Sequence, residues 1–219
     1  MKKIDDQKLT PATTGSVLHG LARYYDLLAW LVMFGREREF REKVVDLARI
    51  KPGESVLDVG CGTGTLAIAA KRRVGPTGKV YGIDASSEMV AIASKKARKK
   101  GVEVEFKNEI IEALPFPDAY FDVVLSTLML HHLPPKVREQ GAREMRRVLK
   151  PGGRVLVVDF GASERKKKGL LGLVHHRHGH VKLADIITVL NAAGLSVVKS
   201  GEVGMRDLYY ALANAPHST

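Results

Sequence analysis

The chain has 219 residues, 45% of them hydrophobic, and 35 basic against 24 acidic side chains give it a formal net charge of +11 at pH 7. This length allows one sizeable core, so we expect a single domain, and the charge favours an anionic partner or surface. No apolar run reaches the ~18–20 residues of a membrane span, none follows the lysines of MKKIDDQKLT, and one cysteine excludes a disulfide framework, so we expect a cytoplasmic protein.

Helical and strand patterns alternate along most of the chain. Two amphipathic stretches, at about 16–34 and 36–50, predict helices that pack on a core. Strands are then predicted at SVLDVG, KVYGID, VEVEFK, FDVVLST and GRVLVVDF, with helical spacing between most of them. A basic segment at 163–180 is followed by a helix, VKLADIITVLNAAG, and by closing strands in LSVVKSGEV and MRDLYYALA. This order predicts an α/β fold, a Rossmann-like, doubly wound, mostly parallel seven-stranded sheet with helices on both faces.

The stretch VLDVGCGTG, from Val56, passes from the first expected strand into a helix through three alternate glycines. A doubly wound sheet binds ligands at the carboxyl ends of its strands, so this loop is expected to form the floor of a site. We expect Gly60 to make the turn, and Gly62 and Gly64 to let a ligand lie against the main chain and the helix N-terminus. Asp84 ends the second expected strand, twenty residues after Gly64, where a carboxylate can accept both hydrogen bonds of a ribose diol.

Two positions discriminate between adenosine-containing ligands. The dinucleotide fingerprint is GxGxxG, whereas this loop reads GCGTG and has Thr65 where the third glycine or alanine belongs. Asp58 precedes Gly60 by two residues and would repel a pyrophosphate, but it would attract a cation. S-adenosylmethionine carries an ammonium and a sulfonium and has no phosphate. The residues therefore favour S-adenosylmethionine as the cofactor. They make an NAD-dependent dehydrogenase a less favoured function.

Four segments carry a family resemblance: VLDVGCGTG, VYGIDASSEM, EALPFPDAYFDVVLS and REMRRVLKPGGRVLVVDF. In this order and spacing, over about 24–160, they resemble the class I S-adenosylmethionine-dependent methyltransferases of the type that methylates ubiquinone and menaquinone precursors. The resemblance implies that Asp58 and the loop from Gly60 to Gly62 hold the methionine moiety and that Asp84 binds the ribose. It also divides the domain into an N-terminal helical cap (1–50), a cofactor-binding core (51–160) and an acceptor-side segment with closing strands (161–219).

The same resemblance extends to the adenine and to the cover of the site. Met89 and the backbone around Ala85 are expected to line the adenine. Tyr25 matches a tyrosine that helps to close the N-terminal helices over the cofactor in relatives, although a core aromatic is an equal alternative. The full set of residues expected at the cofactor is Tyr25, Asp58, Gly60, Cys61, Gly62, Thr63, Gly64, Asp84, Ala85, Met89, Glu109, Ile110, Ile111 and Ser126.

One position departs from the family pattern. Relatives commonly read GDAEALPF where this chain reads NEIIEALPF, so Ile110 stands where an aspartate usually contacts the adenine amino group. An isoleucine side chain cannot accept that hydrogen bond. We expect backbone groups of Ile110 or Ile111, or the side chain of Glu109, to recognise the adenine edge instead.

Two histidines follow the fourth expected strand, in STLMLHHLPP. Methyl transfer mainly requires an acceptor held in line with the methyl group, and a base then only removes the proton of the acceptor. His131 or His132 is the candidate for that base or for orienting the acceptor. A histidine that packs in a loop or hydrogen-bonds the backbone is the competing interpretation.

The acceptor is less defined by the sequence. The segment from Ser126 to Met129 lacks the Asn/Asp-Pro-Pro-aromatic signature of enzymes that methylate nucleobase amines, and Cys61 alone does not suit arsenite chemistry. A quinone precursor, a phospholipid headgroup and a hydrophobic metabolite remain open as acceptors, and so does the oligomeric state. The alternative of a different class is a noncatalytic, basic nucleic-acid-binding protein on a Rossmann-like scaffold, but aromatic residues are only 6% of the chain and nucleic acid is not expected.

The basic segment ERKKKGLLGLVHHRHGH suggests peripheral contact with an anionic membrane. The four cations from Arg165 to Lys168 would be attracted to anionic lipid, and the following apolar residues could enter the interface: Leu170, Leu171, Leu173 and Val174. A basic surface loop whose leucines cover the core is an equal alternative. The histidines between His175 and His180 match no closed metal-binding pattern, so no metal is expected.

Overall fold

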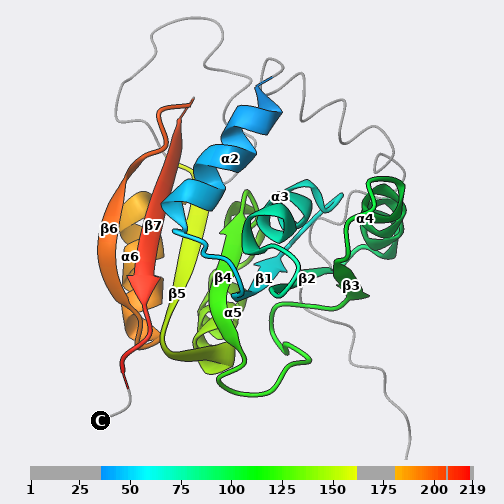
Figure 1. Ribbon diagram of the computed structural model, residues 1–219. Helices are drawn as coiled ribbons and strands as arrows, with labels where there is room; N and C mark the ends of the chain where they lie inside the picture. The colour runs from blue at the N-terminus through cyan, green and yellow to red at the C-terminus, as the bar shows by residue number, and fades with distance from the viewer. Residues whose placement is uncertain (1–35, 162–180, 206, 218–219) are drawn as a thin grey trace, which may run out of the picture.

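The computed structural model describes residues 36–161, 181–205 and 207–217 (Figure 1). Its centre is a seven-stranded sheet in the order β3-β2-β1-β4-β5-β7-β6. The strands are β1 (Ser55–Val59), β2 (Lys79–Asp84), β3 (Glu105–Asn108), β4 (Phe121–Thr127), β5 (Leu149–Phe160), β6 (Ser196–Glu202) and β7 (Leu208–Asn214). Pairs among β1 to β5 are parallel, whereas β7 is antiparallel to both β5 and β6. The predicted Rossmann-like, mostly parallel sheet is confirmed.

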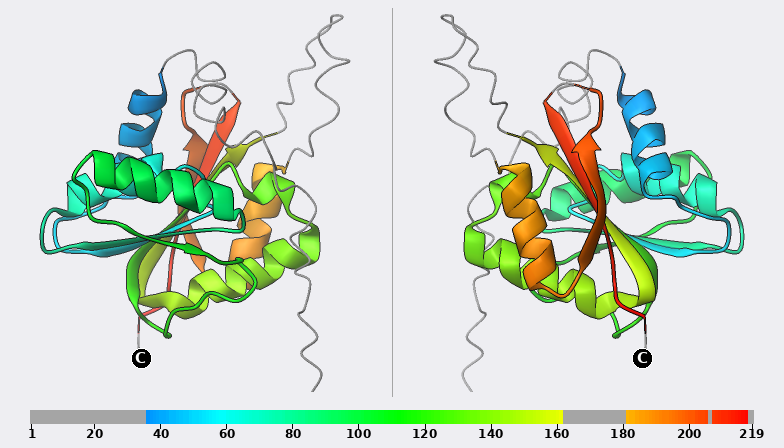
Figure 2. Two further views of the ribbon diagram at one scale, coloured as in Figure 1. Left: turned by 90° about the vertical axis from the view of Figure 1, so that its right-hand side faces the viewer. Right: turned by 90° about the vertical axis from the view of Figure 1, so that its left-hand side faces the viewer.

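Helices cover both faces of this sheet, as Figure 2 shows edge-on. They are α2 (Glu37–Leu47), α3 (Thr65–Val74), α4 (Ser87–Lys99), α5 (Pro135–Val148) and α6 (Leu183–Ala192), with a 3-10 turn η1 (Leu130–His132) after β4. Side chains of α5 and α6 pack on one face with Leu57 and Val59, and those of α2 and α3 pack on the other face with Val56. This split follows from the two-residue alternation of side chains along β1.

Local sequence explains where several helices begin and end. The Oγ of Ser86 accepts a hydrogen bond from the Met89 N–H at 3.3 Å, so Ser86 caps the N-terminus of α4. Pro135 opens α5, where a missing N–H is not needed by the helix. Gly75 follows the last residue of α3 with a positive φ of 73°, which a glycine adopts without strain.

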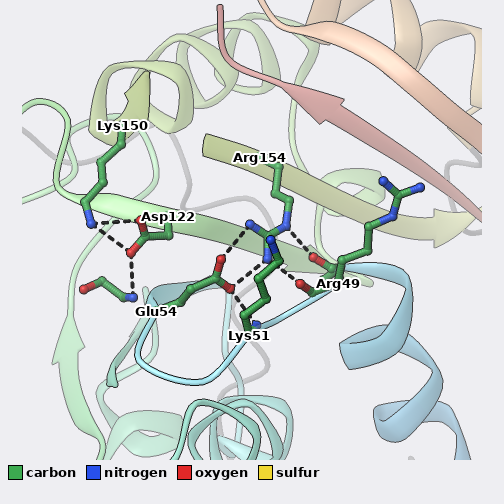
Figure 3. A network of polar contacts seen from close by, with 8 residues as sticks. Arg49, Lys51, Glu54, Asp122, Lys150 and Arg154 are labelled. Atoms are coloured by element: carbon green, nitrogen blue, oxygen red, sulfur yellow. Dashed lines mark hydrogen bonds and ion pairs between the residues drawn. The ribbon is translucent and has the colours of Figure 1, made fainter. Parts of the chain in front are cut away.

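A polar network fixes the amino-terminal edge of the sheet (Figure 3). Arg154 of β5 donates to the carbonyl oxygens of Ala48 and Arg49 at 2.6 Å each, just after α2, and to both carboxylate oxygens of Glu54 at 3.0 and 2.8 Å. Beside it, Lys150 donates to Asp122, which also accepts the Ser55 N–H at 2.9 Å. The network ties α2 and the start of β1 to β5, at the edge opposite the expected ligand site.

The predicted elements differ from the structure mainly at their ends. The helix predicted at 36–50 is α2, and it ends at Leu47. β5 starts at Leu149 rather than at Gly153, and its pairing with β4 shifts register between Phe121 and Val123. The helix predicted at 16–34 and the basic segment at 163–180 lie outside the described residues. Within the described part of the chain, no helix is long and apolar enough to cross a membrane.

Candidate active site

The carboxyl ends of β1, β2 and β4 meet at one edge of the sheet. Val59 is in register with Ile83 on β2 and with Ser126 on β4. The loop that leaves β1, Asp84 at the end of β2 and the end of β4 therefore lie on neighbouring strands, as the sequence predicted. The structure brings most of the predicted cofactor residues to this edge, while Tyr25 lies outside the described residues.

The glycine loop takes its shape from three left-handed residues. Gly60, Gly62 and Gly64 have φ of 71°, 52° and 74°, a region that other residues enter only with strain. The N–H groups of Gly60 and Cys61 both donate to the Ile83 carbonyl oxygen, at 2.9 and 2.8 Å, so the loop is tied to β2. The loop is thus a fixed backbone turn between β1 and α3.

Neighbouring side chains pack closely against two glycines of the loop, Gly64 and Gly60. A Cβ on Gly64 would lie 2.6 Å from Phe106 Cζ and 2.8 Å from Ala93 Cβ, so this position lets α4 and β3 approach the loop. A Cβ on Gly60 would lie 2.6 Å from Met129 Cγ. Close approach at Gly64 is therefore made by the protein itself, where the sequence analysis expected a ligand.

Asp58 is the most unusual charge of the site. Its side chain is only 1% exposed, and neither carboxylate oxygen has a hydrogen-bond partner among the residues that the structure describes. Burial is the main reason that the pKa of this carboxyl is raised to about 7; the positive charge of Arg41 on α2 and the Ala67 N–H oppose the shift, and the charge of nearby Asp84 adds to it. A buried carboxylate without a partner is costly, so the position suits a group that brings a positive charge.

Asp84 is held by the backbone around it. Its Oδ2 accepts the Gly62 N–H and its Oδ1 accepts the Ser86 N–H, each at 2.9 Å. Burial raises the pKa of the carboxyl, and these two N–H groups oppose that shift. A carboxylate oxygen accepts more than one hydrogen bond, so both oxygens keep capacity for a ligand hydroxyl while their orientation is already fixed.

The residues expected at the adenine differ in their burial. Met89 is buried at the start of α4, Ala85 is exposed, and Glu109 and Ile110 are half-buried, with the Glu109 N–H bound to the Asp84 carbonyl at 3.2 Å. Ile111 belongs to the core on the α5 side, where its side chain fills the space beside Gly141. Only the backbone of Ile111 therefore remains available for the recognition that was predicted there.

Polar side chains of the loop and of β4 complete the predicted set. The Thr63 hydroxyl accepts a hydrogen bond from Lys96 Nζ at 2.8 Å, and the same amine reaches Thr65 at 3.0 Å. Ser126 is fully buried, and its Oγ has no partner within the described part of the chain. Burial raises the pKa of the Cys61 thiol well above its ordinary value, which agrees with a small packed residue rather than a reactive thiolate.

His131 is fixed by an acid that the sequence analysis did not identify. Its Nδ1 lies 2.5 Å from Oδ1 of Asp159, which is 1% exposed near the end of β5, and its backbone N–H donates to Oδ2 of the same carboxylate at 3.1 Å. The His131 ring also packs against the rings of His132 and Phe160, with centroids 3.8 and 5.3 Å away. His132 is exposed, so the two predicted histidines have different surroundings.

Three residues of the site were missed from the sequence: Asp159, Arg41 and Lys96. The rule that selected Asp84, an acid at the carboxyl end of a parallel strand, would also have selected Asp159 in GRVLVVDF. No sequence signal placed Arg41 near Asp58, because α2 meets the sheet through tertiary packing alone. Among the described residues, no group of three His, Cys, Asp or Glu side chains is arranged to hold a metal ion, and His175 to His180 lie outside them.

Comparisons with known proteins agree with this fold. A family model described as a methyltransferase domain matches residues 56–153. The ubiquinone/menaquinone biosynthesis C-methyltransferase UbiE of Erwinia tasmaniensis is 40% identical over 146 residues, covering 66% of this chain and 57% of that protein. The UbiE of Cupriavidus metallidurans is 35% identical over 159 residues, covering 73% of this chain and 64% of that protein. This chain thus spans about three fifths of the length of these curated relatives.

Solved structures extend the match to most of the chain. A SAM-dependent methyltransferase from Aquifex aeolicus superposes with a TM-score of 0.68 at 30% identity, covering 80% of this chain and 88% of that one. A geranyl diphosphate C-methyltransferase from Streptomyces coelicolor shares the fold alone, with a TM-score of 0.69 at 15% identity over 81% of this chain and 76% of that one. The chain belongs to the class I S-adenosylmethionine-dependent methyltransferases.

Proposed function

We propose that this chain transfers the methyl group of S-adenosylmethionine to a small aromatic acceptor of the quinone type. Membership of the family indicates the cofactor, and the UbiE relatives support the acceptor class. The observation that carries the proposal is Asp58, a buried carboxylate without a described partner beside a glycine loop, because it fits a ligand that is cationic and lacks phosphate. The matched relatives do not support the alternative of a noncatalytic nucleic-acid-binding protein.

The residues at the sheet edge fit the parts of this cofactor. Asp58 would face the ammonium, and the backbone from Gly60 to Gly62 would lie along the methionine moiety. Asp84, already oriented by the N–H groups of Gly62 and Ser86, would accept the ribose hydroxyls. The backbone near Ile110 would meet the adenine edge, so recognition there does not require the aspartate that this chain lacks.

When bound, the cofactor supplies an electrophilic methyl group. The remaining task of the chain is to place the acceptor atom in line with that group and to exclude competing water, which supplies about 7–11 kcal/mol in well-oriented reactions. His131 and His132 follow β4 at the same sheet edge and are our candidates for orienting the acceptor or accepting its proton. Ser126, whose buried hydroxyl has no partner in the described ranges, lies near the end of the same strand.

Peripheral attachment to an anionic membrane is a further part of the proposal, and it rests on sequence. Arg165 to Lys168 with the leucines that follow combine charge and apolar surface in a segment that comes directly after β5. A hydrophobic quinone precursor would be available at such a surface. The transfer assay described next distinguishes this acceptor from a phospholipid headgroup or a hydrophobic metabolite.

A transfer assay with methyl-labelled cofactor tests the acceptor directly. The substrates are a short-chain naphthohydroquinone, a phospholipid extract and total RNA, each incubated with the purified chain. We expect label in the hydroquinone and none in RNA. Label in the lipid headgroup alone would move the proposal to that acceptor, and label in RNA alone would contradict it.

A further inference from the structure

We propose that Asp159 is a positioning residue which fixes the tautomer of His131, so that Nε2 of His131 accepts the proton of an acidic acceptor. The acceptor class that follows is a phenol or hydroquinone, whose oxygen or activated ring carbon loses a proton on methylation. This inference rests on the proposed methyl transfer and deepens it. Its basis is the geometry of the carboxylate, the imidazole and the strand ends that hold them.

The carboxylate of Asp159 is surrounded by N–H donors. Oδ1 accepts the Phe160 N–H at 2.8 Å and lies 2.5 Å from His131 Nδ1, while Oδ2 accepts the His131 N–H at 3.1 Å. The His131 side chain is 7% exposed and that of Asp159 is 1% exposed, so water competes little for these contacts. The backbone N–H groups of His131 and Phe160 thus fix the orientation of the Asp159 carboxylate independently of its contact with the imidazole ring.

This arrangement determines which ring nitrogen carries the proton. An ionised carboxylate can only accept hydrogen bonds, so Nδ1 of His131 must be the donor in their contact. In a neutral imidazole the other nitrogen, Nε2, is then unprotonated and free to accept a proton. The rings of His132 and Phe160 limit rotation of the imidazole, so the accepting nitrogen keeps one direction.

The strand ends place this pair at the site. Asp159 and Phe160 are the last residues of β5, and His131 lies in η1, which follows β4. Thr127 at the end of β4 is in register with Val158, directly before Asp159. β4 also neighbours β1, whose carboxyl end carries Asp58 and the glycine loop. The pair therefore borders the same edge of the sheet as the proposed methionine moiety.

The chemistry of the step balances with these groups. The acceptor atom forms a bond to the methyl carbon, and the methyl–sulfur bond breaks with its electron pair on sulfur. The proton that the acceptor loses passes to Nε2 of His131, and the adjacent Asp159 carboxylate stabilises the imidazolium until the proton leaves to solvent. An acceptor without a proton to lose, such as a tertiary amine or a thioether, has no use for this pair.

The test compares the wild type with Asp159→Asn. Long-range ¹H–¹⁵N spectra of the imidazoles should show His131 protonated at Nδ1 in the wild type and a changed tautomer population in the variant. Turnover with the naphthohydroquinone should fall about 10²-fold or more, while KM and the affinity for S-adenosylmethionine change less than about threefold. Asp122→Asn removes a carboxylate of the opposite sheet edge and should leave the tautomer and the turnover as they are.

The outcomes separate this inference from the proposed function. A wild-type chain that binds no S-adenosylmethionine would contradict the methyltransferase itself. Cofactor binding together with unchanged turnover in Asp159→Asn, or with a wild-type His131 protonated at Nε2, would overturn only the role of Asp159. The wild-type spectrum tests the tautomer even where the variant fails to fold. Equal losses of cofactor affinity and turnover in the variant would indicate a structural acid and would also overturn the inference.

Discussion

At the scale of single residues, the buried charge of Asp58 links cofactor binding to pH. Its pKa is raised to about 7, so in the free protein the carboxyl is largely protonated below neutral pH. A bound ammonium favours the ionised form, so binding at lower pH must release a proton. We expect the affinity for S-adenosylmethionine to rise up to tenfold per pH unit from about pH 5 towards pH 7 and then to level off.

The substitution Asp58→Asn checks this linkage. It should flatten the pH slope in calorimetric titrations and weaken binding at neutral pH about tenfold or more, because a charge-assisted contact is lost. The free protein should respond in the opposite sense. A carboxyl whose pKa is raised on folding contributes stability that is lost as pH rises through that pKa, so thermal unfolding of the unliganded wild type should show this decline. The decline should be smaller in the variant, where Asp84 is the carboxyl of the pair that remains. An unchanged pH slope in the variant would assign the effect to another group.

The two histidines should differ in their contributions to turnover. His131 is held by Asp159 in the structure, whereas His132 is exposed. We expect His131→Ala to lower turnover about 10²-fold or more, and His132→Ala to lower it less than about tenfold, with little change in cofactor affinity for either. Steady-state kinetics with the hydroquinone measure both. A larger loss in His132→Ala would reverse the assignment.

Sequence alone placed Asp58, the glycine loop and Asp84 at one edge of the sheet, because they lie at the carboxyl ends of two strands that the sequence predicted. It could not show that Asp58 has no hydrogen-bond partner among the described residues or that the Ile111 side chain packs in the core, since both depend on how α5 and the loop pack against the sheet. Asp159 shows a different limit. Its strand was predicted, but nothing in the sequence indicated that η1 would bring His131 to it.

At the scale of elements, the glycine loop sets the distance between α4 and the sheet. Gly64 and Gly101 both have positive φ, 74° and 62°, but a Cβ at Gly64 would meet Phe106 and Ala93, whereas a Cβ at Gly101 would meet nothing within 4 Å. We expect Gly101→Ala to cost about 1–2 kcal/mol of stability from backbone strain. Gly64→Ala should cost about 1–3 kcal/mol more from overpacking. Denaturant unfolding compares them, and equal losses would argue against the packing role of Gly64.

Element prediction succeeded where hydrophobic periodicity was strong and failed at boundaries set by tertiary contacts. The alternation of strands and helices from SVLDVG to GRVLVVDF predicted β1 to β5 and the helices between them. The extension of β5 back to Leu149 depends on its pairing with β4, where the register shifts between Phe121 and Val123. Pairing of this kind produces no hydrophobic pattern in the local sequence. The end of α2 at Leu47 is likewise fixed beyond the helix, where Arg154 binds the carbonyls of Ala48 and Arg49.

At the scale of the whole molecule, the net charge of +11 remains unexplained by the cofactor site, which holds the acids Asp58 and Asp84. The membrane proposal accounts for part of it. We expect the chain to cosediment with anionic vesicles at low salt, to be released as salt rises, and to bind less when Lys166, Lys167 and Lys168 become glutamate. Lys95, Lys99 and Lys100, changed in the same way, are the control for charge alone. If the chain does not cosediment with anionic vesicles at low salt, the membrane proposal is wrong and a soluble acceptor is favoured.

Calorimetric titration of the purified chain with S-adenosylmethionine, beside NAD, tests the central claim most directly. The wild type should bind S-adenosylmethionine and its demethylated product more tightly than NAD. Asp84→Ala should lose about 2–3 kcal/mol of that binding because the ribose contact is charge-assisted. Asp118→Ala, which removes an exposed acid paired with Arg147, should bind like the wild type. Tighter binding of NAD, or unchanged affinity for S-adenosylmethionine in a folded Asp84→Ala variant, would contradict the account.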